Sequence, residues 1–401
     1  MSSEHDWRSA LSSLDRYENI QKLKAAIEAS DPASTSAQKD AFSKENEAYK
    51  NSASIDDYNA ICSAPLAQQQ QPPPSSPPFH QAVGEQDEAA TSPGITIGSY
   101  HGCHHVAGGV TAEVYRAQAR ALKVITETRD IAPHDPFREA KILASLTSSS
   151  SSGSGSSQTS IIPLLETFRD QEQRFVLVFP YMPLTLESLL ARREPVNRAQ
   201  TRRIFTDIFG ALKDLHARGI VHRDIKPSAV LLESPDGPAY LSDFGTAWHP
   251  KLSLATEPAD GKILDIGTGP YRAPEVLFGD KSYGPPVDMW GAGAMLVECC
   301  REPPRRPLFE SRAAHEDGNQ LGLILSIFQT MGSPTRESWP EAAHFRTPPF
   351  EMYRAFDVRE WSEILPEVEP PYRDLVSSLV KYDRSRATAS EALDFLTSKC
   401  S

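Results

Sequence analysis

The sequence predicts an α+β fold in which a small, strand-rich lobe precedes a larger helical lobe. Residues 114–125 (VYRAQARALKVI) have the pattern of two short strands joined by a turn, and residues 174–179 (RFVLVF) that of a buried strand. A helix is expected between them at 136–146. Helical periodicity dominates later, as in residues 198–219 and 285–300. Two such lobes leave a cleft between them, which is a common place for a small-molecule site.

Length and composition narrow the class of protein. The 401 residues suffice for one large domain with extensions, and the net charge of -12 argues against nucleic acid or an anionic membrane as the main partner. Five cysteines, two of them adjacent at Cys299 and Cys300, predict free thiols in a reducing compartment. No run approaches the roughly 18 apolar residues of a membrane span. We therefore expect a protein of the nucleus and/or the cytoplasm.

Composition also divides the chain into parts. Residues 1–63 form a polar, acidic extension with helical periodicity, and residues 64–94 are rich in Gln, Pro and Ser, which predicts a disordered linker. Residues 95–400 have globular composition, interrupted by a flexible Ser/Gly insertion at 147–160. The extension has two interpretations: a loosely folded tail, or a helix whose apolar face packs on the small lobe. That apolar face comprises Trp7, Leu11, Leu14, Tyr17, Ile20, Leu23 and Ile27.

Five charged residues of the globular part match the needs of phosphoryl transfer, which requires neutralised phosphates, a metal and a carboxylate near the acceptor hydroxyl. Lys123 lies mid-strand between apolar neighbours, so it needs an anion, and Glu139 on the next helix can supply one. Asp224 in HRDIKP is the candidate base, and Lys226 can reach the transferred phosphate. Asp243 in LSDFGTA is the candidate Mg²⁺ ligand, because a hard cation prefers carboxylate oxygen.

The order and spacing of these motifs, with APE at 273–275 and DMWGAG at 288–293, resemble a eukaryotic protein kinase domain over about residues 100–396. The resemblance implies the bilobal protein kinase fold. Lys226 and the GT at 267–268 resemble the Ser/Thr class. YRAPEVLFG and the segment at 306–341 resemble the cyclin-dependent kinases and their relatives, the CMGC group.

The resemblance also implies a site. It implies ATP and Mg²⁺ as cofactors, a protein Ser or Thr as acceptor, catalysis by Asp224, Lys226, Lys123 and Glu139, and metal binding by Asp243. Phe179 falls at the gatekeeper position, Pro180, Tyr181 and Met182 at the hinge that binds adenine, and Glu275 is expected to pair with Arg386. The implied nucleotide-binding residues are Val106, Ala107, Gly108, Gly109, Val114, Ala121, Lys123, Phe179, Tyr181, Met182, Leu231 and Asp243.

Two departures from the kinase pattern concern the nucleotide. The glycine-rich loop reads AGGVTAEV at 107–114, so that Gly109 is kept while Ala107 and Ala112 take the other two glycine places. Glycine lets backbone approach phosphate closely, so we expect weakened nucleotide binding. Ala229 stands where the family binds metal with Asn, and it has no donor atom. We interpret the chain as an active enzyme; the alternative is a pseudokinase scaffold.

A third departure lies in the activation segment. Twelve residues before Glu275, where cyclin-dependent kinases are phosphorylated on threonine, this chain has Ile263. Arg138 and Arg223 keep two places of the arginine cluster that would bind the phosphate, and Trp248 takes the third.

We therefore expect a segment that is ordered without phosphate at residue 263. Asp260 and Asp265 are the candidates to occupy the two arginines, and Thr256 is a less favoured phosphorylation site.

The last departure is the helix at 134–143 (HDPFREAKIL), which lacks the cyclin-binding sequence. We expect a monomer without a standard cyclin, and no nucleic-acid or membrane partner. Together the departures are similar to the single-subunit CDK-activating kinases of fungi. This resemblance implies a protein substrate, with a cyclin-dependent kinase as the candidate.

Overall fold

The computed structural model describes residues 94–109, 111–126, 132–148, 159–311, 320–350 and 355–400, together with scattered residues between Asn19 and Cys62. The chain divides into two units, Met1–Asp87 and Glu88–Ser401. Almost all of the predicted linker at 64–94 and most of the predicted insertion at 147–160 lie outside the described residues.

The N-terminal unit has a buried apolar cluster of its own, formed by Leu23, Ala41, Ala48, Tyr58 and Cys62 with Ile27 and Tyr49 packed against it. The Tyr58 hydroxyl donates a 2.7 Å hydrogen bond to Glu45 inside this cluster. Leu23 and Ile27 belong to the predicted apolar helix face, whose other five residues lie outside the described part of the chain. Packing of this face on the small lobe stays a prediction.

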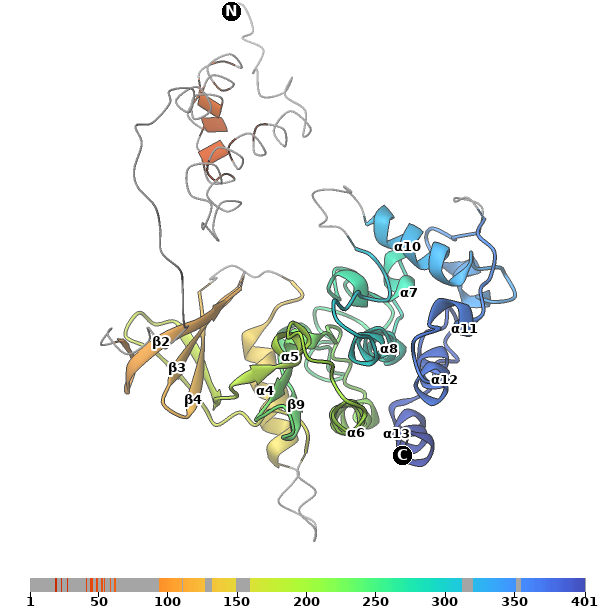
Figure 1. Cartoon of the computed structure of the whole chain (residues 1–401). Coiled ribbons are helices and arrows are strands. Elements are labelled where there is room, and N and C mark those ends of the chain that lie inside the picture. The colour runs from red at the N-terminus through yellow and green to blue at the C-terminus, as the bar shows by residue number, and fades with distance from the viewer. Residues whose placement is uncertain are drawn as a thin grey trace, which may run out of the picture. The chain divides into compact units, whose positions relative to one another are not determined.

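The small lobe is an antiparallel sheet of six strands (Figure 1). The predicted pair of strands at 114–125 is confirmed as β3 and β4, joined by a turn in which Gln118 has a φ of 53°. In sheet order the strands are β1 (Ile95–Ile97), β2 (Tyr100–Gly108), β3 (Ala112–Ala117), β4 (Arg120–Ile125), β6 (Phe175–Pro180) and β5 (Glu166–Arg169).

Strand β6 is buried on both faces, as its continuous apolar sequence predicts. Because side chains alternate along a strand, Val176 and Val178 enter the core on one face of the sheet. Leu177 and Phe179 enter the main core on the other face. The second face is the one that meets the rest of the domain.

Helix α4 (Pro136–Ser148) packs on that second face, where Ile142 and Leu143 join the main core. Asp135 precedes it, and its carboxylate accepts from the backbone N–H of Arg138 at 2.9 Å. The helix runs two residues beyond the predicted end at 146.

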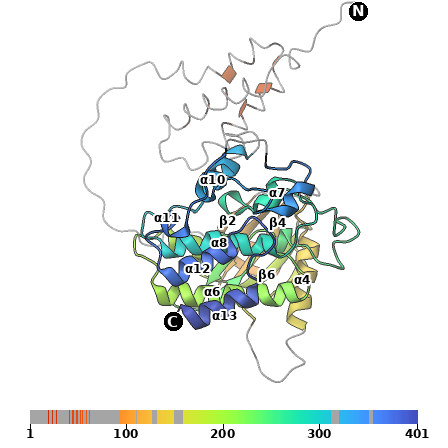
Figure 2. The same ribbon diagram turned by 90° about the vertical axis from the view of Figure 1, so that its right-hand side faces the viewer.

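The larger lobe is mainly helical, with a second sheet of three short strands, β7 (Leu184–Thr185), β8 (Val230–Leu232) and β9 (Ala239–Leu241). Figure 2 shows α6, α8, α12 and α13 as roughly parallel rods, with α13 against α6 and α12 against α8. The helices are α5 (Leu186–Leu190), α6 (Arg198–Ala217), α7 (Pro274–Leu277), α8 (Pro286–Cys300), α10 (Leu321–Met331), α11 (Trp361–Ile364), α12 (Pro370–Leu379) and α13 (Ala389–Lys399). Single 3₁₀ turns are η4 (Pro227–Ala229), η5 (Phe244–Thr246), η6 (Gly269–Tyr271) and η7 (Pro340–His344).

The ends of α6 follow from local sequence. Asn197 and Gln200 form a capping box, in which each side chain accepts from the other residue's backbone N–H at 2.9 Å. Gly219, just past the C-terminus, has a φ of 71°, which an L side chain rarely adopts. The predicted helix at 198–219 is confirmed with its end two residues earlier.

Helix α8 is the centre of the larger lobe, because all residues from Val287 to Val297 are buried. Its nearly all-round apolar sequence, predicted as a helix at 285–300, is typical of a helix enclosed by others. None of the helices among the described residues is long and apolar enough to cross a membrane.

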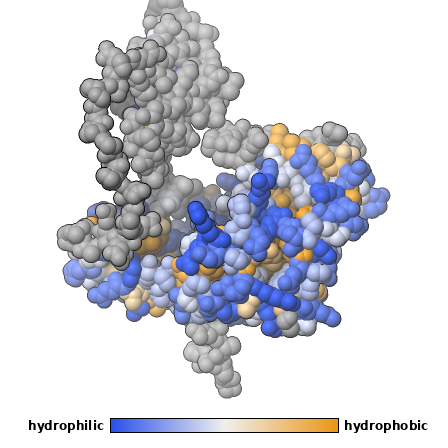
Figure 3. All heavy atoms as spheres, in the orientation of Figure 1, coloured by the Kyte–Doolittle hydropathy of each residue, from blue (hydrophilic) through white to orange (hydrophobic). Residues whose placement is uncertain are grey.

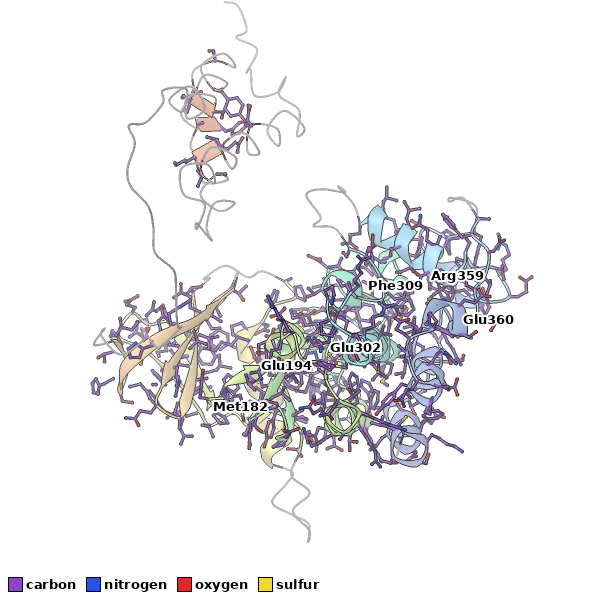
Figure 4. The ribbon with its side chains drawn as sticks, viewed as in Figure 1. Met182, Glu194, Glu302, Phe309, Arg359 and Glu360 are labelled. Atoms are coloured by element: carbon purple, nitrogen blue, oxygen red, sulfur yellow. The ribbon has the colours of Figure 1, made fainter. Side chains whose placement is uncertain are left out.

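The visible surface of the larger lobe is mostly hydrophilic, with a hydrophobic patch at the position of α10 (Figure 3). There Leu321 and Leu325 are partly exposed, while the other face of the helix enters the core. A surface pocket near this helix is lined by residues that include Glu302, Glu310 and Arg359, two of which are labelled in Figure 4. None of the predicted catalytic residues lines it.

Candidate active site

The placement of Lys123 follows from strand alternation. Its neighbours Leu122 and Val124 enter the core on the outer face of the sheet, so Lys123 points to the face covered by α4. There its Nζ lies 2.9 Å from both carboxylate oxygens of Glu139, in the first turn of α4. The predicted pairing of Lys123 with Glu139 is present.

Asp243, which belongs to the larger lobe, contacts the same ammonium group of Lys123. Its Oδ1 lies 3.1 Å from Lys123 Nζ, across a separation of 120 residues. Asp243 has a left-handed backbone (φ 63°) just before η5, and the next residue, Phe244, is fully buried. The backbone N–H of Asp135 donates to Gly245 O at 2.9 Å, which ties the start of α4 to this turn.

Electrostatics at this junction favour the charged forms of Lys123 and Asp243. Lys123 holds the pKa of the Asp243 carboxyl well below its usual range, against the effect of burial. Burial alone would lower the pKa of Lys123, but the carboxylates of Glu139 and Asp243 raise it above the ordinary value. Burial raises the pKa of Glu139, with Lys123 opposing this shift. The Asp243 side chain remains 43% exposed, so it is open to a ligand.

A buried carboxylate on α8 accepts hydrogen bonds from the backbone of the catalytic loop, which carries Asp224. Asp288 accepts from the backbone N–H groups of His222 at 2.9 Å and Arg223 at 2.8 Å. It also lies 2.9 Å from His216 Nε2. Arg223 has a φ of 74°, a conformation that needs such support in a residue other than glycine. The DMWGAG motif, which contains Asp288, therefore fixes the backbone that carries Asp224.

Asp224 and Lys226 meet as predicted, and a third residue joins them. Lys226 Nζ lies 2.5 Å from Asp224 Oδ2. The hydroxyl of Thr268 donates to Asp224 Oδ1 at 2.6 Å and accepts from Lys226 at 3.2 Å. In the sequence, Thr268 indicated only the Ser/Thr class of kinase. Its contact with Asp224 could not be predicted, because the two residues lie 44 positions apart.

Ala229 lies in η4, between Asp224 and Asp243 in the sequence, and the residue is 1% exposed. Its carbonyl accepts from both the backbone N–H and the hydroxyl of Ser242 at 2.9 Å. His222 Nε2 lies 2.8 Å from Ser242 O. The backbone of this position thus anchors the strand that leads to Asp243, but the methyl group offers no metal ligand.

The implied nucleotide-binding residues fall into two groups. Ala121, Met182 and Leu231, from both lobes, pack against the main core, to which Phe179 belongs. The turn between β2 and β3 is closed by a 2.9 Å hydrogen bond from Gly109 N–H to Ala112 O, and Val114 lies on β3 facing Lys123 in register. Val106, Ala107 and Gly108 are exposed residues at the end of β2. Their contact with nucleotide stays a prediction.

The hinge contains one group that is already engaged. Tyr181 donates its backbone N–H to Ala119 O at 2.9 Å, and Arg116 lies over its ring at 4.4 Å from the centroid. This N–H is therefore unavailable to adenine. Met182, labelled in Figure 4 at the junction of the lobes, is the nearer candidate for a backbone contact with the base.

The expected pair of Glu275 and Arg386 is present as a bidentate contact. Arg386 Nη1 and Nη2 lie 2.6 and 2.8 Å from the two oxygens of Glu275. The guanidinium also lies 4.9 Å from the centroid of the Trp290 ring. Because both groups are buried and the contact is bidentate, this ion pair strongly connects the end of the activation segment to the rest of the larger lobe.

The expectation that Asp260 or Asp265 would occupy the two arginines of the activation segment is wrong. Asp260 is exposed, and Asp265 is 81% exposed and paired with Arg272 at 3.2 Å. The carboxylate between Arg138 and Arg223 belongs to Glu257, whose sequence context carried no signal because the path of the segment decides which acid turns inward.

Comparison with known proteins gives a consistent result. Residues 101–395 match the protein kinase domain family. The chain is 33% identical over 306 residues to the serine/threonine-protein kinase csk1 of Schizosaccharomyces pombe, covering 72% of this chain and 91% of that protein. It is 29% identical to the serine/threonine-protein kinase CAK1 of Saccharomyces cerevisiae, covering 60% and 76%. A crystal structure of the yeast RNA Pol II CTD kinase CTDK-1 complex is similar with a TM-score of 0.58 and 25% identity, covering 79% and 95%.

Proposed function

Because the chain belongs to the protein kinase family, we propose that its substrates are cyclin-dependent kinases, phosphorylated on their activation segments. The chain is an ATP-dependent serine/threonine protein kinase, like the relatives it resembles. A scaffold without turnover is not supported, because those relatives are named as serine/threonine-protein kinases and the catalytic charges are all in place. The observation that carries the activity is the contact of Lys123 with both Glu139 and Asp243.

The geometry assigns a role to each charge. Lys123, oriented by Glu139, neutralises phosphate oxygens of ATP that are not transferred. Asp224 accepts the proton of the substrate hydroxyl while the new O–P bond forms and the bond between the γ-phosphorus and the bridging oxygen breaks. Lys226, 2.5 Å from Asp224, is placed to stabilise the charge of the migrating phosphoryl group. The products are ADP and a phosphorylated serine or threonine.

A divalent metal, which we propose is Mg²⁺, fits the residues present. Asp243 offers a partly exposed carboxylate whose pKa is held low, which suits a hard cation. When bound, the ion neutralises charge on the phosphates of ATP. Ala229 supplies no second ligand from the catalytic loop, so the protein's share of the coordination rests on Asp243.

We further propose that the kinase works as a monomer without a standard cyclin, in the nucleus and/or the cytoplasm. In cyclin-dependent relatives a partner is needed to hold the glutamate helix inward. Here α4 is held by contacts within the chain, namely Lys123 with Glu139 and the backbone of Asp135 with Gly245. The resemblance to single-subunit CDK-activating kinases supports the same conclusion.

The test is a kinase assay of the purified full-length protein on a cyclin-dependent kinase that bears or lacks its activation-segment threonine. We expect phosphate incorporation only into the threonine-bearing protein, and at a rate roughly 10²–10⁴-fold lower with the Asp224→Asn variant. Labelling of a generic Ser/Thr peptide without labelling of the cyclin-dependent kinase would refute the proposed substrate and leave the enzyme class intact.

A further inference from the structure

The activation segment contains a buried carboxylate at the centre of an arginine pair. Glu257 is 1% exposed. Its Oε2 lies 2.6 Å from Arg223 Nη1, and its Oε1 lies 3.2 Å from Arg223 Nη2 and 3.4 Å from Arg138 Nη1. Both arginines are themselves buried, at 6% and 2% exposure for Arg138 and Arg223. A buried guanidinium requires an anion, and Glu257 is the acid that supplies it to both.

The same glutamate organises the segment around it. Its Oε2 accepts from the backbone N–H of Ile263 at 3.2 Å, and its backbone carbonyl accepts from Trp248 Nε1 at 3.0 Å. Burial alone would raise the pKa of Glu257, but the hydrogen bonds and charge of Arg223 lower it. The carboxylate is therefore ionised at neutral pH and holds together three stretches of chain.

Ile263 stands where related kinases carry a phosphorylated threonine, and the carboxylate of Glu257 reaches its N–H from six residues earlier in the chain. A phosphate carries about -1.5 to -2 charges and is captured by a set of arginines. A carboxylate carries one charge, and here two arginines face it while neutral Trp248 takes the third place. The anion of lower charge is therefore matched by a cluster with fewer arginines.

Although Trp248 is neutral, a cation lies beside its ring. The ammonium of Lys262 lies 4.7 Å from the centroid of the Trp248 ring and 5.4 Å from that of Tyr283. The Tyr283 hydroxyl accepts from Arg223 at 3.0 Å and donates to Ile263 O at 2.7 Å. These contacts form a closed assembly around Glu257 that needs no added phosphate.

The arginines connect this assembly to the catalytic groups. Arg138 precedes Glu139 on α4, and Arg223 precedes Asp224 in the catalytic loop. Arg223 Nε also donates to the carbonyl of Thr246, in the turn that follows Asp243. An anion that fixes both arginines therefore acts on the positions of three catalytic carboxylates through their immediate neighbours.

We propose that Glu257 is a positioning residue that replaces the activating phosphate, so that the kinase is active without phosphorylation of its activation segment. The inference rests on the kinase activity but not on the identity of the substrate. It is therefore tested with a generic Ser/Thr peptide. A wild-type protein that is inactive even before phosphatase treatment would count against the enzyme class, whereas a Glu257 variant with full activity would count against the role of Glu257.

The experiment compares full-length wild type, treated with phosphatase and shown by mass spectrometry to lack phosphate, with Glu257→Gln and Glu257→Asp. Glu257→Gln is expected to lower kcat/KM for the peptide by about tenfold or more, the factor for losing a charge-assisted hydrogen bond. The KM for ATP should rise as well, because Arg138 lies next to Glu139, the partner of Lys123, and Arg223 donates to Thr246 in the turn that follows Asp243. Glu257→Asp keeps the charge and should recover part of the loss.

Asp260→Asn removes one exposed negative charge from the same segment and serves as the matched control, with activity like wild type. The Arg138→Gln/Glu257→Gln double variant should lose less kcat/KM, expressed as a free energy, than the Arg138→Gln and Glu257→Gln variants lose together. The reason is that each single substitution already leaves its partner unpaired. Full activity of Glu257→Gln overturns the proposal. If that variant does not fold, loss of wild-type activity on phosphatase treatment overturns it equally.

Discussion

The two ends of the active site differ in what they keep of the kinase pattern. At the acceptor end, Asp224, Lys226 and Thr268 form a complete network with distances of 2.5, 2.6 and 3.2 Å. At the nucleotide end, Ala107 and Ala112 replace glycines and Ala229 replaces a metal ligand, while Lys123 and Asp243 remain in contact at 3.1 Å.

The difference separates groups that act on the migrating phosphoryl group from groups that only hold the nucleotide and its metal. Transfer depends on charges placed where the transition state develops charge, so their loss is severe. Weaker binding of ATP raises the ATP concentration needed for half-maximal rate but leaves the rate of the chemical step unchanged. Substitutions at the acceptor end should therefore have larger effects than substitutions at the nucleotide end.

The largest effect is expected at the acceptor end, from Asp224→Asn. An amide cannot accept the proton of the substrate hydroxyl, so kcat should fall by roughly 10²–10⁴-fold. Stabilisation by ATP in thermal unfolding should remain, since Asp224 contacts Lys226 and Thr268 and not the nucleotide-binding pair of Lys123 and Asp243. A variant that keeps more than half of the wild-type kcat would remove Asp224 from the role of base.

The next effect is expected from Lys123→Met, compared with Glu139→Gln. Lys123 neutralises two carboxylates, and its removal leaves Glu139 and Asp243 facing each other without a cation. Breaking such a buried pair costs about 3–5 kcal/mol, so both the melting temperature without ligand and kcat/KM should fall.

Glu139→Gln leaves Lys123 paired with Asp243 and should have the smaller effect on both measurements. Equal losses in the two variants would mean that Lys123 acts only as a partner of Glu139.

A gain is expected from Ala229→Asn at the nucleotide end. The added amide oxygen supplies a second metal ligand near Asp243, which should lower the Mg²⁺ concentration for half-maximal activity by roughly tenfold, equivalent to about 1.4 kcal/mol. Ser228→Asn places the same side chain one residue earlier and should leave the Mg²⁺ dependence unchanged. The comparison is a titration of kinase activity with Mg²⁺ at saturating ATP.

The smallest effect is expected from Ala107→Gly in the exposed end of β2. Removing its Cβ lets backbone approach phosphate more closely, and the KM for ATP should fall about twofold, as expected for about 0.5 kcal/mol. Ala119→Gly, in the exposed turn between β3 and β4, is the matched control. An unchanged KM in Ala107→Gly would show that this loop contributes little to nucleotide binding in this chain.

Much of the catalytic geometry was predictable because it is encoded locally. Alternation along β4 decides which face Lys123 occupies, and the short spacing of Asp224 and Lys226 keeps them in one loop. The pair of Glu275 and Arg386 came from the family resemblance and is present. The engagement of Tyr181 N–H with Ala119 was not foreseen, because it depends on how the hinge leaves the sheet.

By itself the sequence determined the strands at 114–125 and 174–179, the main helices, the two-lobed fold and the charges that perform transfer, since these depend on periodicity and on motif spacing. Only the tertiary structure decided that Glu257, rather than Asp260 or Asp265, faces Arg138 and Arg223, and that Thr268 closes the network around Asp224. Several acids of one irregular segment are equivalent in sequence. The path of the backbone, fixed by contacts with distant residues such as Trp248 and Tyr283, selects the one that is buried.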